Sequence, residues 1–156
     1  MDLGTAIIGI ICVAVCAMPF VLTNRSRKKR ERQLLESIKE LAKQQNCKMT
    51  QHETCGNYII GIDETKNFLF FQSNTQEETK QQIVDLSIIA NCNISRKNLK
   101  NQTVERLDLE LTPTDKNKPK IVLEFYNVDL SYQSSGELES IEKWNKLIKK
   151  RLTENK

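Results

Sequence analysis

The sequence predicts a membrane-spanning α-helix followed by a small α+β, mainly β domain that a C-terminal amphipathic helix closes. Three observations carry this prediction. An uncharged segment of 20 residues lies at 3–22, short segments rich in Ile, Val, Phe and Tyr follow residue 47, and residues 134–152 have helical periodicity. Once the apolar segment is set aside, the 156-residue chain has room for one modest domain.

The segment 3–22 is long enough to cross a bilayer. A helix rises ~1.5 Å per residue, so this segment spans ~30 Å, which is the thickness of the hydrocarbon layer. Asp2 precedes the segment and a basic run follows it, the reverse of the order in a secretory signal peptide. We therefore expect a retained, single-pass transmembrane helix in the cell membrane.

A basic collar follows this segment and holds the net charge of the chain. Six basic residues and one acid lie between residues 25 and 32, whereas residues 33–156 contain 18 basic and 18 acidic residues. Such a balanced domain is not expected to bind nucleic acid. Because positive flanks stay in the cytoplasm, we expect the N-terminus outside and residues 25–156 inside, with anionic lipid headgroups at the collar. The collar consists of Arg25, Arg27, Lys28, Lys29, Arg30 and Arg32.

Small residues recur at helical spacing within the predicted membrane helix. Thr5, Gly9, Cys12 and Cys16 fall on one narrow face, where two helices can approach closely. This face predicts a possible homodimer through the membrane helix. The alternative is that these residues are ordinary lipid-facing positions.

Residues 23–46 are expected to form a basic juxtamembrane and amphipathic linker. The apolar residues Leu34, Leu35, Ile38, Leu41 and Ala42 recur at helical spacing, which predicts a helix over 26–45. Two partners could cover this stripe. One is the following domain, and the other is a second copy of the chain.

The β-rich domain is expected at 47–152, with a tail at 153–156. Residues 107, 109 and 111 are Leu and alternate with charged residues, which predicts a strand with one buried and one solvated face. Residues 82–95 allow an alternative, one long bent strand, because only Ser87 interrupts them. Strands are expected at 48–54, 58–63, 68–73, 82–86, 88–95, 104–112 and 120–126.

The C-terminal helix has start and stop signals. Ser134 followed by Glu137 forms a possible capping box, acids lie early and basic residues lie late. The one Trp of the chain, Trp144, is expected to pack in the core. The face that we expect to close the domain consists of Leu138, Ile141, Trp144 or Asn145, Ile148 and Leu152.

This order of elements, with the segments 58–63, 68–71 and 83–94, resembles the bacterial pleckstrin-homology-like (PH-like) domains found beside membrane anchors. The resemblance covers roughly residues 48–152. It implies a seven-stranded barrel or sandwich and a binding or scaffolding module that engages a protein partner or a membrane complex. Members that bind phosphoinositides carry Lys and Arg around the first hairpin loop, whereas the loop here contains Asp63, Glu64, Thr65 and Lys66. Recognition of an inositol lipid at that loop is therefore not expected.

Two alternatives concern chemistry. Cys47, His52, Cys55 and Cys92 include the residue types that hold zinc, so a small metal- or thiol-dependent enzyme is the first alternative. Their spacing matches no tight zinc pattern, and the chain lacks a nucleophile elbow, a phosphate loop and a dinucleotide glycine pattern. The main expectation is therefore a non-catalytic module without a metal or cofactor. The second alternative is a lipid-handling barrel, which needs an apolar cavity under the C-terminal helix.

Overall fold

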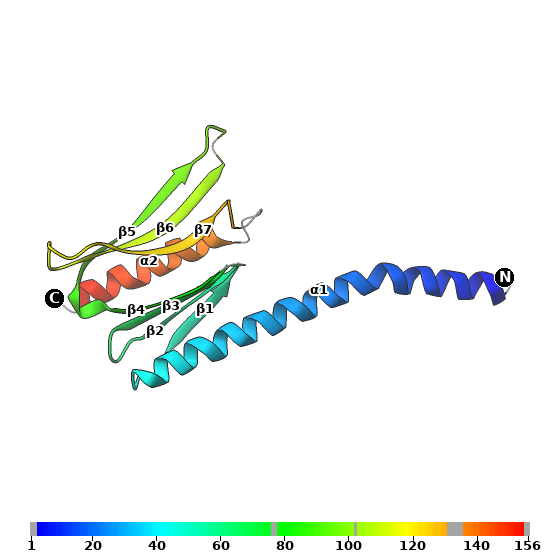
Figure 1. Ribbon diagram of the computed structural model, residues 1–156, viewed down its shortest axis with the longest axis horizontal. Helices are drawn as coiled ribbons and strands as arrows, with labels where there is room; N and C mark the ends of the chain where they lie inside the picture. The colour runs from blue at the N-terminus through cyan, green and yellow to red at the C-terminus, as the bar shows by residue number, and fades with distance from the viewer. Residues whose placement is uncertain (1–2, 76–77, 102, 131–135, 155–156) are drawn as a thin grey trace. The chain divides into compact units, whose positions relative to one another are not determined.

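The computed structural model describes residues 3–75, 78–101, 103–130 and 136–154. Within residues 3–24 it describes the side chains of residues 7, 8, 10–13 and 18. The chain divides into two compact units, residues 1–36 and residues 37–156. One helix, α1 (Leu3–Gln44), begins in the first unit and ends in the second (Figure 1).

A search of the described side chains finds no helix that is long and apolar enough to cross a membrane. Most side chains of the expected segment 3–22 lie outside that description. The transmembrane helix therefore stays a prediction.

The first sheet is an antiparallel meander of four strands in the order β1-β2-β3-β4. The remaining three strands form a second antiparallel sheet, in the order β5-β6-β7. Seven strands were expected and their positions are confirmed within a few residues. The first sheet contains β1 (Gln51–Cys55), β2 (Tyr58–Asp63), β3 (Phe68–Asn74) and β4 (Thr79–Asp85), and the second contains β5 (Ile89–Asn98), β6 (Val104–Pro113) and β7 (Ile121–Asn127).

A short 3-10 helix, η1 (Leu86–Ile88), turns the chain from one sheet into the other. Asp85 starts it, because its carboxylate accepts a hydrogen bond from the Ser87 backbone amide at 2.9 Å. The alternative of one bent strand across residues 82–95 is therefore wrong. The Gln82 side-chain amide donates to the Val122 carbonyl oxygen at 3.3 Å, so the two sheets approach each other along β4 and β7.

The helix α2 (Glu137–Glu154) lies between the two sheets and fills the space where they diverge (Figure 1). Its buried side chains include Ile141, Trp144 and Ile148, which join one hydrophobic core with residues of both sheets. Trp144 is 2% exposed, which confirms its expected place in the core. Leu138, which was expected on the same face, is 38% exposed, and Glu137 and Ser140 are buried instead. The first turn of the helix buries polar residues because it faces polar groups of β1 and β2, Glu53 and Tyr58.

Three aromatic rings join the sheets inside this core. Tyr58 of β2 contacts Phe125 of β7 with ring centroids 4.6 Å apart, and both contact Phe71 of β3 at 5.5 Å. Aromatic pairs at such distances contribute about 0.5–1.5 kcal/mol beyond their buried area. They hold the two sheets together at the end opposite to η1.

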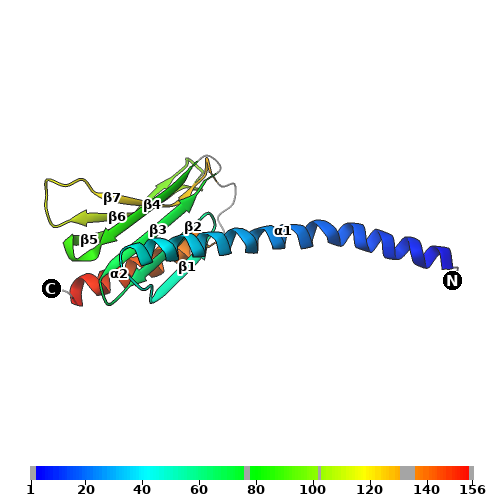
Figure 2. The ribbon, with the colours of Figure 1, turned by 60° about the horizontal axis from the view of Figure 1, so that its bottom comes forward.

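The end of α1 covers the outer face of the first sheet. Ile59 and Phe70 point away from the main core, since their strand neighbours point into it, yet both are fully buried. Ile38 and Ala42 of α1 are also buried, and the Gln81 side-chain amide of β4 donates to the Ser37 hydroxyl of α1 at 3.3 Å. Figure 2 shows this part of α1 along the sheet. The apolar stripe of the linker helix thus packs on the domain.

The segment that follows α1 continues this cover. A Cβ atom on residue 61 would clash with the Met49 sulfur, so Gly61 leaves room for that sulfur. The buried Asp63 side chain accepts a hydrogen bond from the Lys48 amide at 2.8 Å. Residues 37–50 are therefore part of the folded domain, which was expected to begin at residue 47.

Candidate functional site

The six collar residues lie on α1 and all are exposed. With 3.6 residues per turn, Arg25, Lys28, Lys29 and Arg32 share one side of the helix, and Arg27 and Arg30 lie on the other. Together they surround ~10 Å of helix axis. Positive charge on all sides fits a helix that passes through a layer of headgroups, because such a layer meets every side of the helix.

The expected helix–helix face in the membrane segment falls mostly outside the described side chains. Of its four residues, Thr5, Gly9 and Cys16 lie outside them, and Cys12 is exposed. The homodimer through this face stays a prediction.

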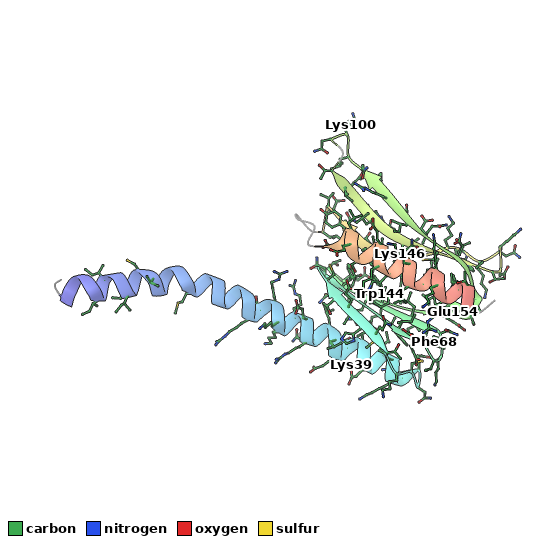
Figure 3. All side chains as sticks on the ribbon, turned by 180° about the vertical axis from the view of Figure 1, so that it is seen from behind. Lys39, Phe68, Lys100, Trp144, Lys146 and Glu154 are labelled. Carbon is green, nitrogen blue, oxygen red and sulfur yellow. The ribbon has the colours of Figure 1, made fainter. Side chains whose placement is uncertain are left out.

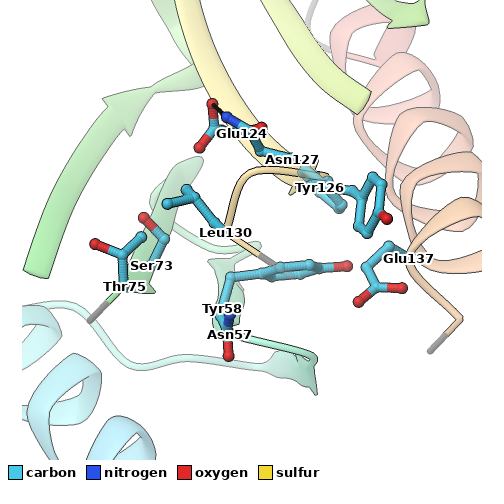
Figure 4. A pocket seen from close by; sticks show the side chains of 10 residues that line it. Asn57, Tyr58, Ser73, Thr75, Glu124, Tyr126, Asn127, Leu130 and Glu137 are labelled. Atoms are coloured by element: carbon cyan, nitrogen blue, oxygen red, sulfur yellow. Dashed lines mark hydrogen bonds between the residues drawn. The ribbon is translucent and has the colours of Figure 1, made fainter. Parts of the chain in front are cut away.

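A small pocket lies between the sheets at the start of α2 (Figure 4). Its volume is about 30 Å³. A water needs about 10–15 Å³ measured in this way, so the pocket has room for one or two waters and none for a lipid. The predicted lipid-handling cavity is not found here. The pocket is lined by Asn57, Tyr58, Ser73, Thr75, Glu124, Phe125, Tyr126, Asn127, Leu130 and Glu137.

Polar groups gather beside this pocket, where β1 and β2 meet the first two turns of α2. Among the described residues, the buried Tyr58 hydroxyl, Ser140 hydroxyl and Trp144 indole NH have no hydrogen-bond partner of good geometry. Ser140 lies beside both Tyr58 and Glu53, and Glu53 pairs with Lys143. Burial raises the pKa of Tyr58 far above its ordinary value of 10.0, so the phenol stays neutral and is no base at physiological pH.

The four candidate ligands Cys47, His52, Cys55 and Cys92 do not meet at one point, because the first two lie on one side of the first sheet and the last two on the other. Successive residues of a strand point to opposite faces, so His52 and Cys55 of β1 point to opposite sides of the first sheet. Cys55 packs against the core that contains Cys92, whereas His52 and Cys47 line a groove on the outer side. In the part of the chain that the structure describes, no group of three or more His, Cys, Asp or Glu residues is placed to hold a metal ion.

The environments of the three thiols make them poor nucleophiles. Burial raises the pKa of Cys92 to about 12. Burial also raises the pKa of Cys55, helped by the nearby carboxylates of Glu137 and Glu53, and that of Cys47, helped by Asp63. A thiol reacts as a thiolate at neutral pH when its pKa is lowered, and all three of these pKa shifts run in the opposite direction. Cys47 is buried, and its backbone amide donates to the Ala42 carbonyl oxygen at the end of α1.

A groove on the outer side of β1 gathers cationic side chains. Its volume is about 390 Å³, within the usual range of small-molecule sites. Lys39 and Lys43 of α1 lie one helical turn apart on its rim, and Figure 3 marks Lys39 (Figure 3). The lining consists of Lys39, Ala42, Lys43, Cys47, Lys48, Met49, Thr50 and His52.

Sequence reasoning missed this groove. The spacing of Lys39 and Lys43 indicates that they share a helix face, but many solvated helices have such pairs. The groove exists because the chain reverses after Gln44 and brings Lys48 and Met49 back beside the helix. No short motif signals that reversal.

Comparison of the chain with protein-family models, with curated proteins and with solved structures finds no match.

Proposed function

We propose that this protein is a single-pass, membrane-anchored, non-catalytic binding module with a PH-like β domain. In this proposal residues 3–22 cross the cell membrane with the N-terminus outside. Residues 25–156 lie in the cytoplasm, where the β domain engages a protein partner or a membrane complex.

The basic collar is the observation that carries the membrane part of the proposal. Six cations surround one helix directly after 20 uncharged residues of that same helix. A docking site for one acidic protein would need charge on one side of the helix only. Anionic headgroups can pair with every side, at ~1 kcal/mol for each cation.

The separation of reactive groups supports the non-catalytic part. His52 and Cys55 lie on opposite faces of β1, and Cys47, which shares a groove with His52, is buried. All three thiols have raised pKa values. The polar groups beside Tyr58 are buried around a pocket of about 30 Å³, which is too small for an organic substrate. A metal- or thiol-dependent enzyme would need its groups in one accessible place.

The arrangement of the strands supports the PH-like part. Two antiparallel meanders, of four and three strands, approach along one side and enclose a C-terminal helix on the other. Binding domains of this architecture use their surfaces rather than their filled interior. The interior here is filled by Trp144 and its neighbours.

Cysteine labelling of intact cells tests the topology. The variants Asp2→Cys and Lys118→Cys are each treated with a bulky, membrane-impermeant maleimide, before and after permeabilisation. We expect Asp2→Cys to react in intact cells and Lys118→Cys to react only after permeabilisation. The unmodified chain is the control for its own thiols, because Cys47 and Cys92 are buried, Cys55 is partly buried, and Cys12 lies within the proposed membrane span.

Two further results complete this test. Replacing the six collar residues with Gln should weaken or reverse the labelling pattern, whereas replacing exposed lysines of the β6–β7 loop should leave it unchanged. Release of the protein from membranes by alkaline carbonate would contradict an integral anchor. Crosslinking and mass spectrometry in native membranes would then identify the partner, with Lys97 and Lys120 as exposed attachment points.

A further inference from the structure

We propose that the groove between the end of α1 and β1 binds a single-chain lipid phosphate, a phosphate monoester on an aliphatic chain. This inference concerns residues 37–156 alone and does not depend on the membrane anchor or on the PH-like architecture. It is also distinct from the interior pocket at the start of α2, which lies between the sheets.

The charge of the rim fits a phosphate monoester. Lys39, Lys43 and Lys48 are exposed and line the groove together with His52, and its eight lining residues include no Asp or Glu. Within the described residues none of these three lysines forms a salt bridge. A phosphate monoester carries about −1.5 to −2 charges at neutral pH. Three unpaired ammonium groups complement that charge better than they complement a single carboxylate.

The floor of the groove fits an aliphatic chain. Ala42, Cys47 and Met49 line it, and Ala42 and Cys47 are buried. The Met49 thioether is half-buried against Gly61, and methionine adapts its shape to flexible apolar ligands. The stems of the lysines add methylene groups above this floor.

Two other classes of ligand fit less well. No Phe, Tyr or Trp lines the groove, so a nucleotide base would find no aromatic ring on which to stack. No arginine lines it either, so the paired hydrogen bonds that specify an acidic peptide are lacking. An apolar floor below a cationic rim is the pattern that a lipid phosphate requires.

Protection of individual lysines tests this proposal in the full chain, held in nanodiscs of zwitterionic phosphatidylcholine. The probe is octyl phosphate, and the measurement is the rate at which an N-hydroxysuccinimide ester acylates each lysine, read by peptide mass spectrometry. We expect octyl phosphate to slow acylation of Lys39, Lys43 and Lys48 at least threefold and saturably. Lys116 and Lys118, exposed in the β6–β7 loop, should be unaffected.

Two ligands separate the contributions of head and chain. Inorganic phosphate supplies the head alone and octyl glucoside supplies the chain alone. Each should protect the groove lysines at least threefold less than octyl phosphate does. Equal protection by inorganic phosphate would reveal a simple anion patch and overturn the proposal, and so would equal protection by octyl glucoside.

Variants tie the protection to the groove. Lys43→Gln removes an exposed charge without touching the core, and we expect it to reduce protection of Lys39 and Lys48 at least threefold. Lys118→Gln is the matched control and should change nothing. Met49→Gln should reduce protection by octyl phosphate while leaving the weak effect of inorganic phosphate intact. Unchanged protection in Lys43→Gln would overturn the proposal even if Met49→Gln failed to fold.

Discussion

The outer face of the first sheet is buried, whereas the outer face of the second sheet is partly exposed to solvent. In the first sheet all six residues of β2 are buried, because the main core covers one face and residues 37–50 cover the other. In the second sheet β6 alternates between buried leucines and partly exposed polar residues. A continuous apolar strand in a small antiparallel sheet buries both of its faces only when a second layer packs on the sheet. Here the end of α1 supplies it.

The outer face of the second sheet carries ion pairs instead. Arg106 lies between Asp108 at 2.7 Å and Glu124 at 3.1 Å, and Lys120 reaches Glu110 at 3.0 Å. Burial raises the pKa of Asp108, opposed by Arg106, and Glu124 and Glu110 add to the rise. Solvent screens such pairs, so they contribute little to stability. The two outer faces should therefore respond very differently to substitution.

The largest expected difference is between an apolar residue on each outer face. Ile59→Ala should lower the free energy of unfolding by about 2–5 kcal/mol, because it leaves a cavity between β2 and the cover. Val122→Ala should cost less than about 1 kcal/mol, since that side chain is 37% exposed. Urea unfolding of residues 37–156, followed by Trp144 fluorescence, measures both. Equal losses would mean that the two outer faces are alike.

Substitutions in residues 37–50, which cover the outer face of the first sheet, should have the next largest effect on the free energy of unfolding. Ile38→Ala should cost about 2–4 kcal/mol, because Ile38 is fully buried, and the higher helix propensity of Ala offsets part of the loss. Glu40→Ala, on the exposed side of the same helix, should change stability by less than about 0.5 kcal/mol. The same urea titration compares them. A negligible effect of Ile38→Ala would show that this part of α1 is only a linker.

A buried carboxylate beneath the cover predicts a pH dependence. Burial alone would raise the pKa of Asp63, but hydrogen bonds from the Thr65 hydroxyl and from the amides of Lys48, Lys66 and Thr65 lower it to about 2. The folded pKa lies below the ordinary value of 3.8, so the stabilisation is present above pH 4 and is lost as the pH falls toward 2.

Asp63→Asn should therefore cost about 1–2 kcal/mol at pH 7 and flatten the loss of stability between pH 5 and pH 2. Asp115→Asn, in the exposed β6–β7 loop, is the control. Unfolding titrations at a series of pH values provide the measurement. An acid transition that persists unchanged in Asp63→Asn would assign it to other carboxylates.

The smallest change in the free energy of unfolding is expected on the solvent-exposed outer face of the second sheet. Lys120→Gln breaks the pair with Glu110, and both side chains are partly exposed. We expect a loss below about 0.5 kcal/mol that shrinks further in 0.5 M salt. Unfolding at low and high ionic strength measures it. A loss of several kcal/mol would indicate that this face is covered after all.

The strands could be predicted because their signals are local. Short apolar segments separated by polar turn residues predicted the positions of all seven strands to within a few residues, and the alternation in β6 was the clearest of these signals. The periodicity of the last segment predicted α2, but it placed Leu138 in the core. The first turn of α2 departs from the apolar pattern because Glu137 and Ser140 meet polar groups of β1 and β2, and that contact depends on tertiary structure.

The groove and the cover could not be predicted in the same way. Both depend on the reversal of the chain after Gln44, which brings Met49 over Gly61 and the Lys48 amide to Asp63. Each of these contacts joins residues more than ten positions apart, and no periodicity encodes them. The opposite placement of His52 and Cys55, by contrast, follows from strand alternation once β1 is recognised.

The free energy of unfolding of two fragments tests the role of the cover most directly. Residues 37–156 contain the end of α1, and residues 47–156 lack it. We predict that the shorter fragment is less stable by more than about 3 kcal/mol, or fails to fold, because Ile59 and Phe70 then face water. Stabilities that agree within about 1 kcal/mol would contradict the conclusion that this helix end is part of the domain.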